Sequence, residues 1–224
     1  MTLQRQMIPL AALAALVSLP FAAQAAGPAT YEVTFTPGWT AKSHPLDYPE
    51  AGLLTGPHFS GIIGATHAAG FAIYKEGGKP TPGLERLSEM GKHDPLDAEI
   101  KAAIAKGSAG ALFETDAIKD LSQPVTFTVT VDAKHPLVSA VAMIAPSPDW
   151  FAGVANVDLR QGDGWVASKT LDVLAYDSGG DDGTTYKADD KDTNPKKVTS
   201  VNQSAHFTKN GKSVPVAKVT FTKK

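Results

Sequence analysis

The sequence contains no cysteine, and its charges nearly cancel. Without cysteine no disulfide can stabilise the fold, so burial of a core, with or without a metal ion, must do so. Lys and Arg number 21 against 23 Asp and Glu, for a formal net charge of −2. A chain this close to neutral, with no basic stripe among its aromatics, is not expected to bind nucleic acid.

The first 25 residues have the pattern of a secretory signal peptide. Arg5 supplies a positive charge, residues 8–21 are apolar and uncharged, and Ala23-Gln24-Ala25 is a small-x-small cleavage box. The apolar stretch is too short for an ordinary membrane span, so we expect no stable membrane insertion after cleavage. Residues 26–224 are then expected to form a single secreted or periplasmic domain, since their length suits one sizeable core.

Alternation of large and polar residues predicts that the chain is mainly β. Residues 124–132 alternate with period two, and residues 137–144 form an apolar run interrupted only by Ser139, as in a strand buried on both faces. Further strands are predicted at residues 31–36, within 59–74, and at 153–159, 166–175 and 214–221. No internal repeat or linker interrupts this order, which favours one antiparallel β-sandwich.

Two short helices are predicted between the first strands and the later ones. Residues 82–91 carry apolar residues at helical spacing and stop at a glycine. In residues 94–107, Asp94 is expected as N-cap, Pro95 as the first helical residue and Gly107 just beyond the end. Loops are expected at residues 40–57 and, polar and mobile, at residues 182–203.

Acidic residues stand in two turns that could meet at one end of such a sandwich. Asp149 follows a Pro-Ser-Pro turn, and Asp177 and Asp181 flank a Ser-Gly-Gly stretch, with Asp182 as a weaker fourth candidate. Ca²⁺ takes several oxygen ligands, which short acidic side chains on flexible turns can supply. A solvated turn is the ordinary alternative for each aspartate alone. Their crowding favours a shared cation, because like charges otherwise repel.

Other chemistries find less support in the residues. The spacing after Asp177 does not fit an EF-hand, and the chain has no HExxH or GxSxG motif. His58 and His67 are better interpreted as packed histidines bonded to the backbone than as zinc ligands. A carboxylate pair could serve glycoside hydrolysis, but these acids follow strands in glycine-rich loops with no evident cleft. We therefore name no catalytic residue.

Several separated motifs, in order, resemble the spondin N-terminal domain family over residues 31–221, approximately. They are HFSGxxGAxH at 58–67, GLxxLxExG at 83–91, PSPDWFxGV at 146–154, GDGW at 162–165 and YDxGxDxG at 176–183. The resemblance implies a C2-like sandwich and a Ca²⁺ ion held by Asp149, Asp177 and Asp181. The absence of cysteine and the style of the signal are typical of a bacterial member.

The expected function is that of an exported, calcium-binding, non-enzymatic domain. The resemblance implies adhesion or recognition at a cell surface or in the extracellular space, with a cell-surface or matrix protein, or a glycan, as partner. Two alternatives stay open: a metal-dependent or glycoside hydrolase, and a structural periplasmic protein that uses the metal for stability alone.

If the signal is cleaved after Ala25, the exported protein should begin at Ala26. N-terminal sequencing of protein recovered outside the cytoplasm tests this, because the small-x-small box places the cut there. Recovery of a chain that still carries Met1 would contradict the prediction.

Overall fold

The computed structural model describes residues 27–50 and 56–224. The expected signal peptide and part of the predicted 40–57 loop lie outside the described residues. The helices are α1 (Pro82–Met90) and α2 (Leu96–Ala105). The strands are β1 (Ala29–Pro37), β2 (His58–Phe59), β3 (Ile63–His67), β4 (Ala109–Glu114), β5 (Val125–Val131), β6 (Leu137–Ala145), β7 (Trp150–Asp158), β8 (Arg160–Gln161), β9 (Gly164–Trp165), β10 (Ser168–Asp177), β11 (Ser200–Val201), β12 (Thr208–Lys209), β13 (Lys212–Ser213) and β14 (Ala217–Lys223).

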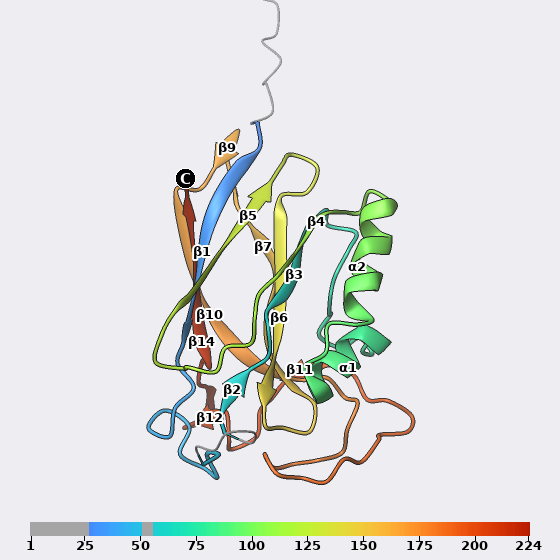
Figure 1. Ribbon diagram of the computed structural model, residues 1–224, viewed down its shortest axis with the longest axis vertical. Helices are drawn as coiled ribbons and strands as arrows, with labels where there is room; N and C mark the ends of the chain where they lie inside the picture. Colours follow the sequence, from blue (N-terminus) through green and yellow to red (C-terminus); the bar gives the residue numbers. More distant parts are fainter. Residues whose placement is uncertain (1–26, 51–55) are drawn as a thin grey trace, which may run out of the picture.

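One large antiparallel sheet folds back on itself into a sandwich that is nearly a closed barrel (Figure 1). Its strand order is β4-β3-β6-β7-β10-β14-β1-β5, so β4 and β5 are the edges. The edges meet where Phe113 stacks on Phe127, with ring centroids 5.4 Å apart. The predicted β-sandwich with two short inserted helices is therefore confirmed.

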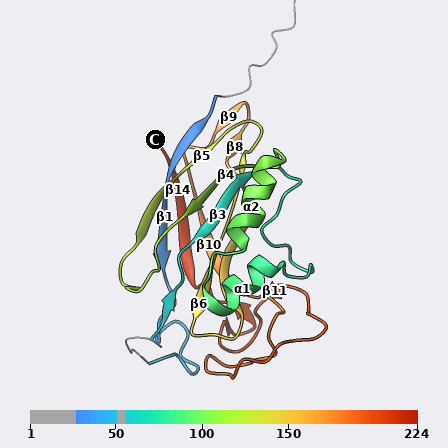
Figure 2. The same cartoon turned by 45° about the vertical axis from the view of Figure 1, so that its right-hand side comes forward.

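Two apolar cores explain the burial patterns of the strands. The interior of the sandwich contains Tyr31, Trp39, Phe59 and Trp150, and in β1 buried residues alternate with more exposed ones. A second core lies between the sheet and the helices, which run along its outer face in Figure 2. All five residues of β3 are buried, because side chains on both faces of this strand are covered.

The helices differ from each other in how they begin. Thr81 caps α1 by accepting a hydrogen bond from the Leu84 N–H, and Gly91 ends it in the left-handed conformation. The prediction that Asp94 caps the second helix is wrong. That helix begins at Leu96 with Pro95 in the cap position, which leaves it without a side-chain cap.

Two strands near the acidic turns have different bounds from those expected. β7 begins at Trp150 rather than residue 153, and β10 continues to Asp177, because Trp150 and Asp177 pair across the two strands. β4 was not predicted, since its sequence Ala-Gly-Ala-Leu-Phe-Glu alternates weakly. The 182–203 segment is mostly irregular, but Tyr186 within it is buried among core aromatics rather than solvated.

Gly64 on β3 lies where the sheet leaves no room for a side chain. A Cβ there would lie 2.3 Å from Phe113 Cζ and 2.5 Å from the Ser139 carbonyl oxygen. Gly64→Ala should lower the free energy of unfolding by about 1–3 kcal/mol, because a paired backbone carbonyl must shift. Gly70→Ala is the matched control, since nothing lies within 4 Å of that position. Equal denaturation midpoints for both variants would contradict the packing described.

Candidate metal centre

The predicted acidic residues belong to the turn from β6 to β7 and to the end of β10 with the loop that follows, at the end of the sandwich that is lowest in Figure 1. Asp149 lies in the connection from β6 to β7 and is fully buried. Asp177 is the last residue of β10 and pairs with Trp150, the residue that follows Asp149. The loop after β10 then passes over the Asp149 carboxylate.

One oxygen of Asp149 is enclosed by hydrogen-bond donors of that loop. Its Oδ2 accepts from Ser178 Oγ at 2.8 Å and from the N–H groups of Gly179, Gly180 and Asp181 at 2.9, 2.8 and 3.2 Å. Successive N–H groups arranged in this way form a nest for an anion. The other oxygen, Oδ1, is buried and has no hydrogen-bond partner among the described residues. A buried carboxylate oxygen with a free lone pair fits a cation ligand.

Asp177 carries a second carboxylate into the same region. Its Oδ1 accepts a hydrogen bond from the Gly179 N–H at 2.9 Å. Burial and, to a smaller extent, the nearby charge of Asp149 together raise the pKa of Asp177 to about 6. Burial also raises the pKa of Asp149, although the four donors on its Oδ2 oppose that effect. Both carboxylates are therefore in surroundings that disfavour two uncompensated negative charges.

Asp181 and Asp182 use their carboxylates differently. Both oxygens of the buried Asp181 accept backbone hydrogen bonds, from the N–H groups of Gly183 and Lys191. Asp182 accepts from Thr193 and pairs with Lys197. Asp149, Asp177 and Asp181 do not form a group whose ligand atoms all lie within 4.8 Å of one another. The prediction that they share one ion therefore stays a prediction.

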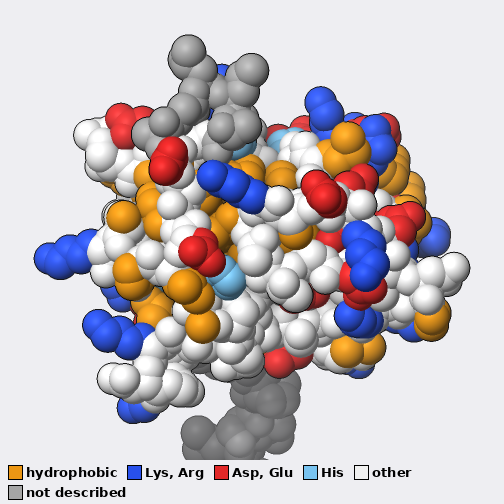
Figure 3. All heavy atoms as spheres, turned by 90° about the horizontal axis from the view of Figure 1, so that it is seen from below, with side chains coloured by type: hydrophobic (Ala, Val, Ile, Leu, Met, Phe, Trp, Pro, Cys, Tyr) orange, Lys and Arg blue, Asp and Glu red, His pale blue; other side chains and the backbone are white. Residues whose placement is uncertain are grey.

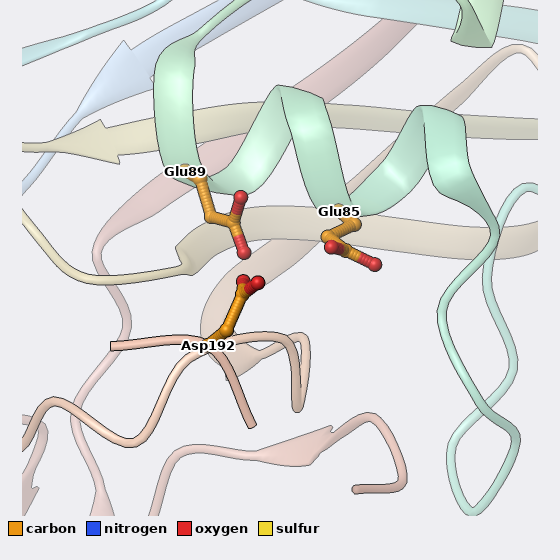
Figure 4. Close-up of side chains that lie close together, drawn as sticks. All are labelled: Glu85, Glu89 and Asp192. Atoms are coloured by element: carbon orange, nitrogen blue, oxygen red, sulfur yellow. The ribbon is translucent and has the colours of Figure 1, made fainter. Parts of the chain in front are cut away.

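A different acidic group meets that distance among the described residues. Glu85 and Glu89 on α1 face Asp192 in the loop, with ligand atoms within 4.8 Å of one another (Figure 4). Lys196 already provides a positive charge there, with its Nζ 2.8 Å from Glu85 and 3.3 Å from Asp192. It also donates to the Gly180 carbonyl at 3.1 Å. The i,i+4 spacing of the two glutamates was visible in the sequence, but their meeting with Asp192 was not.

Glu89 is the member of this group that Lys196 does not pair with. Its Oε1 is buried and has no hydrogen-bond partner among the described residues. Burial, helped by the charges of Glu85, Asp149 and Asp190 and opposed by Lys196, raises the pKa of Glu89 to about 7. A Cβ on Gly180 would lie 2.7 Å from this oxygen, so helix and loop are in close contact here.

The two histidines considered as zinc ligands have structural roles. His58 Nδ1 lies 2.8 Å from the Gly56 carbonyl and His67 Nδ1 lies 2.8 Å from the Ala68 carbonyl, which confirms their interpretation as packed histidines.

Acidic and basic side chains are interspersed on the lower face of the molecule (Figure 3). Within residues 27–50 and 56–224, no helix is long and apolar enough to cross a membrane.

Glu89 should make stability depend on pH. Its pKa rises from 4.5 to about 7 on folding, so between these values the folded state binds more protons, and stability falls as pH rises through this window. Glu89→Gln should remove this slope and be more stable than the unchanged protein near pH 8, by about 1 kcal/mol after solvent screening. Chemical denaturation in metal-free buffer measures it, with the exposed Glu32→Gln as control. The same slope in all three proteins would contradict the assignment.

Comparison with known proteins agrees with the motifs noted in the sequence. The Spondin_N family model matches residues 29–214. Spondin-2 of Homo sapiens is 34% identical over 180 residues, covering 79% of this chain and 54% of that protein. Spondin-1 of Xenopus laevis is 32% identical over 211 residues, covering 88% of this chain and 25% of that protein. The chain thus spans about half or less of the length of these two relatives, and it belongs to the Spondin_N family.

Proposed function

We propose that this chain is an exported spondin-type domain that binds Ca²⁺ at Asp149, Asp177 and Asp181 and acts in adhesion or recognition. The observation that carries the calcium part is the buried, unpartnered Oδ1 of Asp149. A carboxylate whose other oxygen already accepts four hydrogen bonds is held in place before any ion arrives. Such preorganisation favours binding because little freedom is left to lose.

Each ligand would make a different contribution. Asp149 offers Oδ1 without breaking a hydrogen bond, and Asp177 brings a carboxylate from the end of β10. Asp181 would share its oxygens between the ion and the N–H groups of Gly183 and Lys191, or turn away from them. When bound, Ca²⁺ would neutralise carboxylates that burial otherwise penalises and would connect the β6–β7 turn to the loop after β10.

The proposed recognition role follows from the family and from the location of the loops. Cell-surface or matrix proteins, or glycans, are the partners that we propose, and the interspersed charges of the lower face suit a polar interface. The hydrolase alternative has one observation in its favour, the pKa of Glu89 near 7, which is a value suited to a general acid. Glu89 Oε1 is covered by the loop, however, so we favour binding over catalysis.

Calcium should stabilise the protein, and Asp177→Asn should weaken that effect. Binding to the folded state alone adds about 2.7 kcal/mol at a ligand concentration 100 times the dissociation constant. Asp177→Asn removes one charged ligand but keeps the shape of the side chain. Asp172→Asn is the matched control, because Asp172 is exposed on the same strand and pairs with Lys218. Melting temperature and titration calorimetry with CaCl₂ provide the measurements.

The same proteins separate the proposed function from its alternatives. Absence of calcium heat together with an unchanged melting temperature at millimolar CaCl₂ would overturn the metal site. Turnover of esterase, phosphatase or glycosidase substrates that disappears in both Asp177→Asn and Glu89→Gln would overturn the non-enzymatic role. Calcium binding without turnover, lost in Asp177→Asn and kept in Asp172→Asn, is the expected result.

A further inference from the structure

A β-bulge on the helix-covered side of the sheet exposes one asparagine in an unusual conformation. The pairing of β6 with β7 shifts register around Ser139, whose hydroxyl accepts a hydrogen bond from the Asn156 N–H at 2.9 Å. The buried His67 fixes that hydroxyl through its Nε2, at 2.8 Å. Asn156 has a φ of 55° and is exposed. Bulges and left-handed non-glycine residues recur beside binding sites, where they redirect a side chain.

The bulge forms one wall of a pocket of about 540 Å³. The segment 69–76 and the Tyr176 ring form the other walls. This volume lies within the range of about 300–1,000 Å³ for small-molecule sites. The pocket shares no residue with the proposed calcium ligands.

Aromatic rings form the apolar part of this pocket. Tyr176 stacks on Phe151 with centroids 5.3 Å apart and an interplanar angle of 16°. The buried Phe151 ring therefore fixes the orientation of the Tyr176 ring. Tyr74 packs edge-on against Tyr176 at 4.9 Å. Tyr74 is only 6% exposed, and its hydroxyl has no hydrogen-bond partner among the described residues. Phe71 adds a half-buried ring.

The polar part of the pocket is balanced in charge. Lys75 and Glu76 contribute one charge of each sign and are both exposed. The side-chain amide of Asn156 makes no hydrogen bond to any described residue, so it keeps its donors and its acceptor for a ligand. A strongly charged ligand would meet no net opposite charge here.

We propose that this pocket binds a neutral sugar unit of a glycan. A pyranose has a C–H face that packs on an aromatic ring such as Tyr176, and hydroxyls that pair with the Asn156 amide and the Glu76 carboxylate. The net-neutral lining favours such a ligand over nucleotides, phosphates or amines. The proposal goes beyond the calcium site and does not depend on it.

The test follows backbone amide resonances while neutral sugars are added to the full mature chain. The probes are glucose, galactose, mannose and N-acetylglucosamine, each raised to millimolar concentration. At least one should give saturable shifts confined to residues 69–76, 155–156 and 176. Asn156→Gly should bind that sugar about tenfold more weakly, because it loses the amide while glycine keeps the positive φ of the bulge.

A matched control separates recognition from backbone effects. Asn210→Gly changes the same residue type at another left-handed position, φ 52°, in the β12–β13 hairpin and outside the lining of the pocket, and should bind normally. Glu76→Gln should bind within about twofold, because a neutral ligand needs the hydrogen bond rather than the charge. Chelating calcium should leave binding detectable.

Three results would overturn the proposal. The first is no saturable shift in the pocket with any of the four sugars. The second is equal affinity of Asn156→Gly and Asn210→Gly. The third is a tenfold loss of sugar affinity in Glu76→Gln, which would show that the charge of Glu76, and not a net-neutral lining, determines recognition.

Discussion

The buried carboxylate of Asp149 is the interaction on which the lower end of this protein depends. Placing an ionised group out of contact with water costs several kcal/mol unless hydrogen bonds replace the water. Four donors from residues 178–181 do so for Oδ2, and in return the carboxylate fixes the conformation of their loop. This compensation reaches only one of the two oxygens. The other oxygen, Oδ1, has no hydrogen-bond partner among the described residues, and this is the reason for proposing a cation there.

The same loop is anchored a second time against α1. Lys196 reaches from the loop to Glu85, and Glu89 presses against Gly180, which itself donates to Asp149. Acidic groups therefore approach one another from the helix, the loop and the β6–β7 turn. The ammonium groups of Lys196 and Lys197 offset part of this charge. Burial first, and then the charge that is left, raise the pKa values of Glu89 and Asp177.

Sequence patterns predicted the strands well where residues alternate or form long apolar runs, and poorly where neither holds. The pattern of β5 was clear, whereas β4 offered too little contrast. The position of Asp149 and Asp177 near each other followed from motif order and family resemblance. The hydrogen bonds that each of them makes could not be predicted from the sequence, because the nest around Asp149 depends on backbone direction rather than residue type.

Long-range contacts account for the other differences. Tyr186 lies in a stretch of polar residues that predicts a solvated loop, yet its ring packs against Trp39 and Trp150, and Trp39 donates to its hydroxyl. The local sequence around Asp192 likewise does not indicate that this residue lies beside Glu85 and Glu89, in a helix about a hundred residues earlier. Local sequence predicts secondary structure, but not which distant segments become neighbours.

The end of β10 connects the two proposed sites because successive strand residues point to opposite faces. Tyr176 directs its ring toward the helix-covered face and the pocket, while Asp177 directs its carboxylate toward the acidic loop. Thr199 ties the two regions together: its hydroxyl donates to the Ser178 carbonyl, and its backbone pairs with Gly77 and Gly78 beside the pocket. The end of one strand thus supports both the proposed ion site and the proposed ligand site. Substitutions that distort β10 itself should therefore impair both, whereas changes to Asn156 or Asp149 should act on one.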